Sequence, residues 1–132
     1  MIFSDPDGMI YISELSRVEF RSALARMLRM REINNLAQEE AHKNFSKDCR
    51  KRFINIPLNS RTIRKAIELI ERHGSTFSIR TLDALQLAAC ILEGVSDIEF
   101  VCADLNLIKI CKLEGLQVLN PEENKTFADF ME

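Results

Sequence analysis

Residues 98–121, "IEFVCADLNLIKICKLEGLQVLNP", carry the pattern that decides the fold. The apolar run 98–104 is typical of a buried strand that ends in a carboxylate. Helical spacing predicts a helix over 105–113, with Gly115 as its stop. "LQVLNP" then predicts a last strand, which Pro121 ends. A strand, a helix and a second strand in so short a stretch indicate an α/β protein.

The rest of the chain repeats this alternation of strands and helices. The patterns predict further strands over 9–13 and 52–58, and helices over 14–32, 35–51, 60–72 and 81–93. Ser13, Ser60 and Thr81 stand where helix N-caps are expected. No linker or repeat divides the chain, so we expect one domain over residues 1–132, with a parallel sheet covered by helices on both sides.

Composition agrees with a single folded core. The 132 residues are 46% hydrophobic and 29% charged, with a formal net charge of -2, so any nucleic-acid surface would have to be a local basic patch. No apolar run is long enough for a membrane span, and the first residues lack the pattern of a secretion signal. We therefore expect a cytoplasmic protein.

The four cysteines are widely spaced and form no C-x-x-C pair. Three of them, Cys90, Cys102 and Cys111, lie in strongly apolar segments. This pattern favours buried free thiols over a zinc site or disulfides.

Three carboxylates stand out by their positions. Asp104 follows a predicted strand and should project from the carboxyl edge of the sheet, where α/β proteins bind ligands, although Asp is also a good N-cap. Asp83 shares its side of a helix with Leu87 and Cys90, although it is also a first-turn acid that the helix dipole favours.

Glu19 has small neighbours at helical spacing, which leave space around its carboxylate, although pairing with Arg17 or Arg26 is the common alternative. Together, Glu19, Asp83 and Asp104 form an oxygen-ligand set suited to Mg²⁺ or Mn²⁺, of the kind that metal-dependent nucleases use. The chain has no phosphate-binding glycine motif that would indicate a nucleotide site.

These segments resemble the PIN domain and, within it, the VapC-like toxins of prokaryotic toxin-antitoxin pairs. The similar segments are "YISELSRVEFRSALAR", "IRTLDALQLAA" and "FVCADLNLIKICKLEGLQVLNPE", which carry acids at Glu19, Asp83 and Asp104. The resemblance covers about residues 11–122 and leaves 123–132 as a C-terminal tail. It implies a three-layer α/β/α fold around a mainly parallel sheet.

The same resemblance implies an activity and its partners. The chain would hydrolyse RNA phosphodiester bonds with Mg²⁺ or Mn²⁺ held by the three acids. It would form a homodimer and be inhibited by a small antitoxin protein. Arg80, Asn106 and Lys109, together with Lys112, would contact the RNA backbone, or else are ordinary solvated surface groups.

One feature departs from the family pattern. The family begins with a strand that carries its first catalytic Asp, and that opening is missing here. "MIFSD" looks like such a strand, but too few residues separate Asp5 from Ile12 for a parallel crossover. "SDPDG" is therefore interpreted as a turn. We expect an N-terminally truncated sheet whose gap a second chain fills in an extensive dimer.

Three functions remain open on the sequence. The first is a metal-dependent endoribonuclease, which the three acids favour. The second is a catalytically incomplete PIN-like protein that acts by binding RNA or protein, which the missing first Asp favours. The third is a general α/β module in which the acids only cap helices.

Overall fold

The computed structural model describes residues 2–4, 8–94 and 97–123. The strands are β1 (Ile2–Ser4), β2 (Ile10–Ser13), β3 (Phe53–Ile56), β4 (Glu99–Val101) and β5 (Gln117–Leu119). The helices are α1 (Glu14–Arg29), α2 (Asn35–Lys51), α3 (Ser60–His73), α4 (Thr81–Glu93) and α5 (Leu105–Leu113). The strands form one sheet in the order β3-β2-β1-β4-β5.

The sequence led us to expect a gap at the centre of the sheet, but the structure has a strand there. β1 occupies the place between β2 and β4 and runs antiparallel to both, with Phe3 opposite Tyr11 and Phe100. The short connection to β2 explains this direction, because antiparallel strands can be joined by a tight turn whereas parallel ones cannot. β2 pairs with β3, and β4 with β5, in parallel. Four strands therefore share one direction, and the fifth, reversed strand joins the two parallel pairs.

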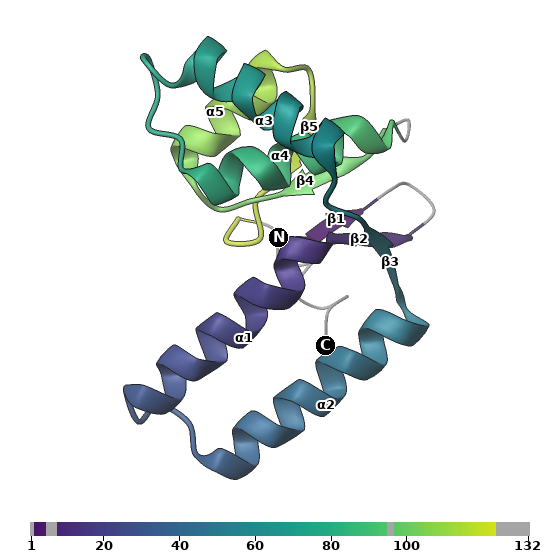
Figure 1. Cartoon of the computed structure of the whole chain (residues 1–132), viewed down its shortest axis with the longest axis vertical. Helices are drawn as coiled ribbons and strands as arrows, with labels where there is room; N and C mark the ends of the chain where they lie inside the picture. The colour runs from purple at the N-terminus through teal and green to yellow at the C-terminus, as the bar shows by residue number, and fades with distance from the viewer. Residues whose placement is uncertain (1, 5–7, 95–96, 124–132) are drawn as a thin grey trace.

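The helices cover the two faces of the sheet separately. α3, α4 and α5 form a cluster on one side, and α1 and α2 form an antiparallel hairpin that projects from the other side (Figure 1). The connection from β2 to β3 runs toward one end of the sheet, and the connection from β4 to β5 runs toward the other end. Two right-handed connections of this kind lie on opposite faces of the sheet. The expected three-layer α/β/α fold is confirmed.

Three expected helix caps differ in detail. α3 is capped by Asn59, whose side chain accepts from the backbone N–H groups of Arg61 and Thr62, and not by Ser60. α4 has Arg80 at its N-cap position, so Thr81 is its first helical residue. Ser13 does stand at the N-cap of α1, but its hydroxyl makes no capping hydrogen bond.

The main core lies between the sheet and the α3–α4–α5 layer. Phe100, Leu69, Leu87 and Ile110 are among its fully buried side chains. Cys90, Cys102 and Cys111 are buried and Cys49 is half-buried, all as free thiols, which confirms that expectation. Within the described residues, none of the helices is both long and apolar enough to cross a membrane.

Candidate metal-dependent nuclease site

The candidate site lies at one edge of the sheet. β2 and β4 both run antiparallel to β1 and therefore end at the same edge. β2 leads directly into α1, which carries Glu19, and β4 is followed by Asp104. In α/β sheets this carboxyl edge is where ligands bind.

Asp83 is the third acid and occupies the first turn of α4. Its side chain is half-buried. Burial raises the pKa of the Asp83 carboxyl above its ordinary value, and the negative charges of Asp104 and Glu19 raise it further, against the lowering effect of Arg80. Glu19 and Asp104, from two other segments of the chain, therefore both act electrostatically on Asp83.

Asp104 has the capping role that the sequence left open. It is the N-cap of α5, and its Oδ1 accepts from the backbone N–H of Leu107 at 3.1 Å. The residue is nevertheless exposed, and its charge contributes to the raised pKa of Asp83. A capping carboxylate uses one oxygen for the helix, so its other oxygen is available to a ligand.

Glu19 is held by a hydrogen-bond network that the sequence analysis missed. The Gln86 amide nitrogen donates to Glu19 Oε1 and, at 3.3 Å, to Ser16 Oγ. The Ser13 hydroxyl donates to Gln86 Oε1 at 2.8 Å, which fixes the orientation of the amide. Ser13, Ser16 and Gln86 are all buried. The described residues include no ion pair between Glu19 and Arg17 or Arg26, the alternative that the sequence left open.

A signal for Gln86 was present in the sequence. It is the one long polar side chain in the apolar run "ALQLAAC", one helical turn after Asp83. A buried amide has to find hydrogen-bond partners, so a glutamine in this position points to polar groups across the interface. The sequence alone does not indicate which groups these are.

The residues proposed to contact RNA differ in how they relate to the three acids. Arg80 lies next to Asp83 and lowers the pKa of that carboxyl. The side chains of Asn106, Lys109 and Lys112 are exposed on α5 and form no hydrogen bond or ion pair with the residues that the structure describes. Glu14 has a structural role, because its Oε2 accepts from the backbone N–H of Leu58 at 3.0 Å and ties α1 to the segment before α3.

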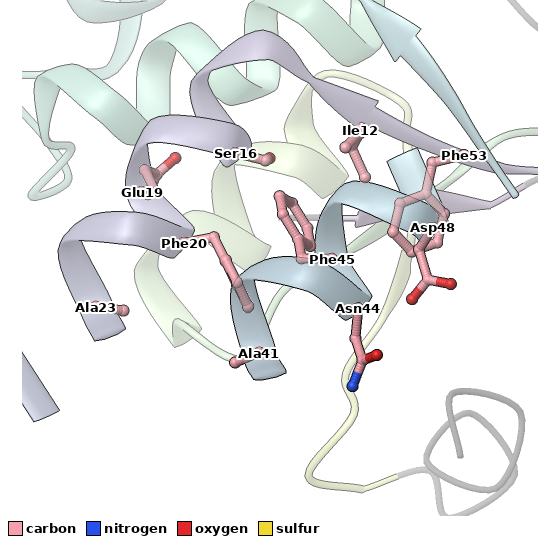
Figure 2. Close-up of a pocket in the computed structure, with 10 residues that line it drawn as sticks. All are labelled: Ile12, Ser16, Glu19, Phe20, Ala23, Ala41, Asn44, Phe45, Asp48 and Phe53. Carbon is pink, nitrogen blue, oxygen red and sulfur yellow. The ribbon is translucent and has the colours of Figure 1, made fainter. Parts of the chain in front are cut away.

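Glu19 also lies in the wall of a cavity of about 550 Å³ between α1 and α2. Figure 2 shows Glu19 and Ser16 on α1, the neighbouring rings of Phe20 and Phe45 between the helices, and Asn44 and Asp48 on α2. Ile12 and Phe53 contribute from β2 and β3. The wall is mainly apolar, so the low polarity around Glu19 strengthens its interaction with the Gln86 amide.

The donor chemistry of the three acids fits Mg²⁺ or Mn²⁺, since both ions prefer carboxylate oxygens. The pKa of the Asp83 carboxyl is raised first by burial and then by the charges of Asp104 and Glu19, and a cation would relieve this repulsion. Within residues 2–4, 8–94 and 97–123, no three acidic, histidine or cysteine side chains stand close enough together to hold one ion directly. Mg²⁺ usually binds through one or two carboxylates and keeps several waters, so the wider arrangement is compatible with it.

Comparison with known families identifies the class. The PIN domain family model matches residues 2–113, and the chain therefore belongs to the PIN domain family. PIN domains generally are metal-dependent nucleases that use Mg²⁺ or Mn²⁺. No curated protein and no solved structure gives a significant match. Asp5, the sequence candidate for the family's first acid, lies outside the described residues.

Proposed function

We propose that this PIN domain is an endoribonuclease that hydrolyses RNA phosphodiester bonds and acts as the toxin of a cytoplasmic toxin-antitoxin pair. Glu19, Asp83 and Asp104 are its catalytic and metal-binding residues. The observation that carries the proposal is the raised pKa of Asp83, whose causes after burial include the charges of the other two acids. Acids that served only their own helices, as Asp104 does when it caps α5, would have no reason to act on one carboxyl in this way.

Each residue of the site has a distinct task in this proposal. A bound Mg²⁺ or Mn²⁺ would lower the pKa of a water and stabilise charge on the phosphate. Asp83 and Asp104 hold the cation, while the Gln86 amide keeps the Glu19 carboxylate turned to the site. Arg80, Asn106 and Lys109 bind the RNA backbone next to the acids.

The direct test is cleavage of a single-stranded RNA by the purified protein with Mg²⁺ or Mn²⁺. We expect Asp83→Asn to reduce the rate by at least the ~100-fold that loss of an outer-shell partner reaches in metal sites. Glu39→Gln is the matched control, because Glu39 is an exposed acid on α2, away from the site. Equal cleavage by both variants, or none by the wild type, would contradict the proposal.

A second function has its own support. The carboxyl end of β1, Ser4, lies opposite Ile10 and Glu99, at the edge of the sheet away from Asp104. In the family the first strand delivers an acid to the site, so this reversal favours a catalytically incomplete PIN-like protein that binds RNA or protein. Mn²⁺ titration separates the two: binding that disappears in Asp104→Asn supports the enzyme, and RNA binding without metal binding supports the alternative.

The oligomer and the antitoxin are also proposals. Since β1 fills the centre of the sheet, the expected gap no longer argues for a dimer. The support is now the α1–α2 hairpin, where Val18, Leu36 and Met30 are 67%, 65% and 61% exposed. We propose that this hairpin forms a homodimer and that the antitoxin binds near the acids. Light scattering that gave a monomer at micromolar concentration would exclude the dimer.

A further inference from the structure

Three arginines gather on the α1–α2 hairpin, away from the acids. Arg17, Arg21 and Arg50 line a cavity of about 240 Å³ together with Phe45, Ser46, Cys49 and Asn55. Its volume is far above the roughly 10–15 Å³ that a single water needs. The cavity therefore has space for a phosphate group.

The charges of these three arginines all act on Cys49. Burial raises the pKa of the half-buried Cys49 thiol, and the three arginines all act in the opposite direction. Arg17 and Arg21 are one turn apart on α1, and Arg21 Nη1 donates to the backbone carbonyl of Arg17 at 3.0 Å. The guanidinium of Arg21 is thus held against its own helix instead of extending freely into solvent.

This positive charge has no matching acid among the described residues. Arg17, Arg21 and Arg50 form no ion pair with them, and Asp48, the acid that acts on Cys49, lies 3.8 Å from Arg52 Nη1. Like charges four residues apart on a helix repel one another. An anion bound in the cavity would attract each of the arginines and so offset this repulsion. Ser46 and Asn55 would supply further hydrogen-bonding groups.

Phe45 indicates what kind of anion fits. Its ring lines this cavity as well as the larger one shown in Figure 2, and it stacks on Phe20 with centroids 4.0 Å apart. A basic surface next to aromatic rings is the usual combination for single-stranded nucleic acid, since the cations contact phosphates and the rings stack on bases. An acidic peptide would use the arginines but not the ring.

We propose that Arg17, Arg21 and Arg50 form a binding site for backbone phosphates of single-stranded RNA, separate from the carboxylate site. The inference rests on the proposed RNA substrate and adds a second contact region to it. At 100° per residue, Arg17 and Arg21 each lie about 160° around α1 from Glu19. The site therefore binds RNA at a distance from the cleaved bond and takes no part in the chemistry.

The test is RNA binding in EDTA, where a metal-dependent nuclease does not cut. A fluorescent single-stranded RNA is titrated with the wild type and with the variant R17Q/R21Q/R50Q. We expect the variant to bind about tenfold more weakly at low salt, and its slope of log affinity against log salt to fall by about 2, near 0.7 for each lost phosphate contact. R29Q/R61Q/R64Q removes the same charge from exposed arginines elsewhere and should behave like the wild type.

Cys49 supplies a local readout. The other three cysteines are buried, so alkylation of the folded protein should label Cys49 first. Bound RNA should slow this labelling several-fold in the wild type and have no such effect in R17Q/R21Q/R50Q. Circular dichroism of both triple variants checks that they are folded, and R17K/R21K/R50K, which keeps the charge, should recover most of the RNA affinity.

The outcomes separate this inference from the proposed function. If RNA is cleaved but the triple variant binds it as tightly as the control does, the arginine site is wrong and the nuclease stands. If nothing is cleaved but RNA binding depends on the arginines, the site stands and the nuclease does not. The inference would also be overturned if R17Q/R21Q/R50Q lost the wild type's binding to a poly-glutamate peptide but bound RNA as the wild type does. The arginines would then serve an acidic protein.

Discussion

The amide of Gln86 holds the carboxylate of Glu19 across the interface between α4 and α1, 67 residues away in the sequence. Because Ser13 donates to the other side of the same amide, the orientation of Gln86 is fixed from both ends. A carboxylate that is positioned in this way needs little reorganisation when a cation binds.

Gln86→Met removes this support while nearly keeping the side-chain volume. We expect the affinity for Mn²⁺, measured by calorimetry, to fall by about 10–100-fold, as it does when outer-shell partners of metal ligands are lost. Ser13→Ala is the graded comparison, because it leaves the contact between Gln86 and Glu19 and should have a smaller effect. An unchanged Mn²⁺ affinity in Gln86→Met would show that the network serves only packing.

The two roles of Asp104 can be separated by two substitutions. Asn caps helices as well as Asp does, so Asp104→Asn should keep the stability of α5 while it weakens Mn²⁺ binding. Asp104→Ala should weaken Mn²⁺ binding and also lower the free energy of unfolding by about 1 kcal/mol through loss of the cap. Urea denaturation and Mn²⁺ titration of both variants check this. Equal stability of the two would mean that the cap contributes nothing.

Glu114 should make stability depend on pH. Burial acts to raise the pKa of its carboxyl, but hydrogen bonds from His73 and Arg72, together with the charge of Arg72, outweigh burial and leave the pKa below its ordinary value of 4.5. His73 Nε2 lies 2.7 Å and Arg72 Nη1 2.6 Å from Glu114 Oε2. The unfolded chain therefore binds a proton more readily than the folded one.

The sign follows from this difference. The contribution of Glu114 is complete above pH 4.5 and is lost as the pH falls through the lower pKa of the folded state. Glu114→Gln should thus be less stable than the wild type by about 1–3 kcal/mol at pH 7, with a difference that shrinks in acid. Urea unfolding at several pH values measures it. A constant difference down to pH 3 would contradict this assignment.

The capping residue of α3 offers a paired test. Asn59→Ala should cost about 1 kcal/mol, since Asn59 accepts from the backbone N–H groups of Arg61 and Thr62. Ser60→Ala, next to it in the chain, removes an exposed hydroxyl that does not serve as the cap and should be neutral. Thermal unfolding measures the stability of both variants. A larger loss in Ser60→Ala than in Asn59→Ala would mean that Ser60 is the cap.

The helices could be predicted closely because their signals are local. The predicted bounds 35–51 and 105–113 agree with α2 and α5, because the periodicity lies within these segments and the capping residues, Asn34 and Asp104, directly precede them. Asp83 and Asp104 could be proposed for the same reason, since each stands at a helix start next to the sheet edge. Both were proposed from their positions relative to secondary structure, which the sequence pattern reveals.

Long-range contacts could not be predicted in this way. β1 is only three residues long, too short for a periodic signal, and its direction depends on pairing with β4 far along the chain. The contact of Gln86 with Glu19 likewise depends on how α4 packs against α1. The arginine cavity requires the hairpin geometry of α1 and α2, because Arg50 is distant in sequence from Arg17 and Arg21.

The reversed central strand also has a consequence for synthesis on the ribosome. Phe3 can pair with Tyr11 almost at once, but its second partner, Phe100, is added nearly a hundred residues later. At 5–20 residues per second this delay is roughly 5–20 s. Throughout that time one side of β1 is an open strand edge in a nascent chain, the kind of surface that aggregates or recruits a chaperone. Production of this protein should therefore depend more on co-translational chaperones than its small size suggests.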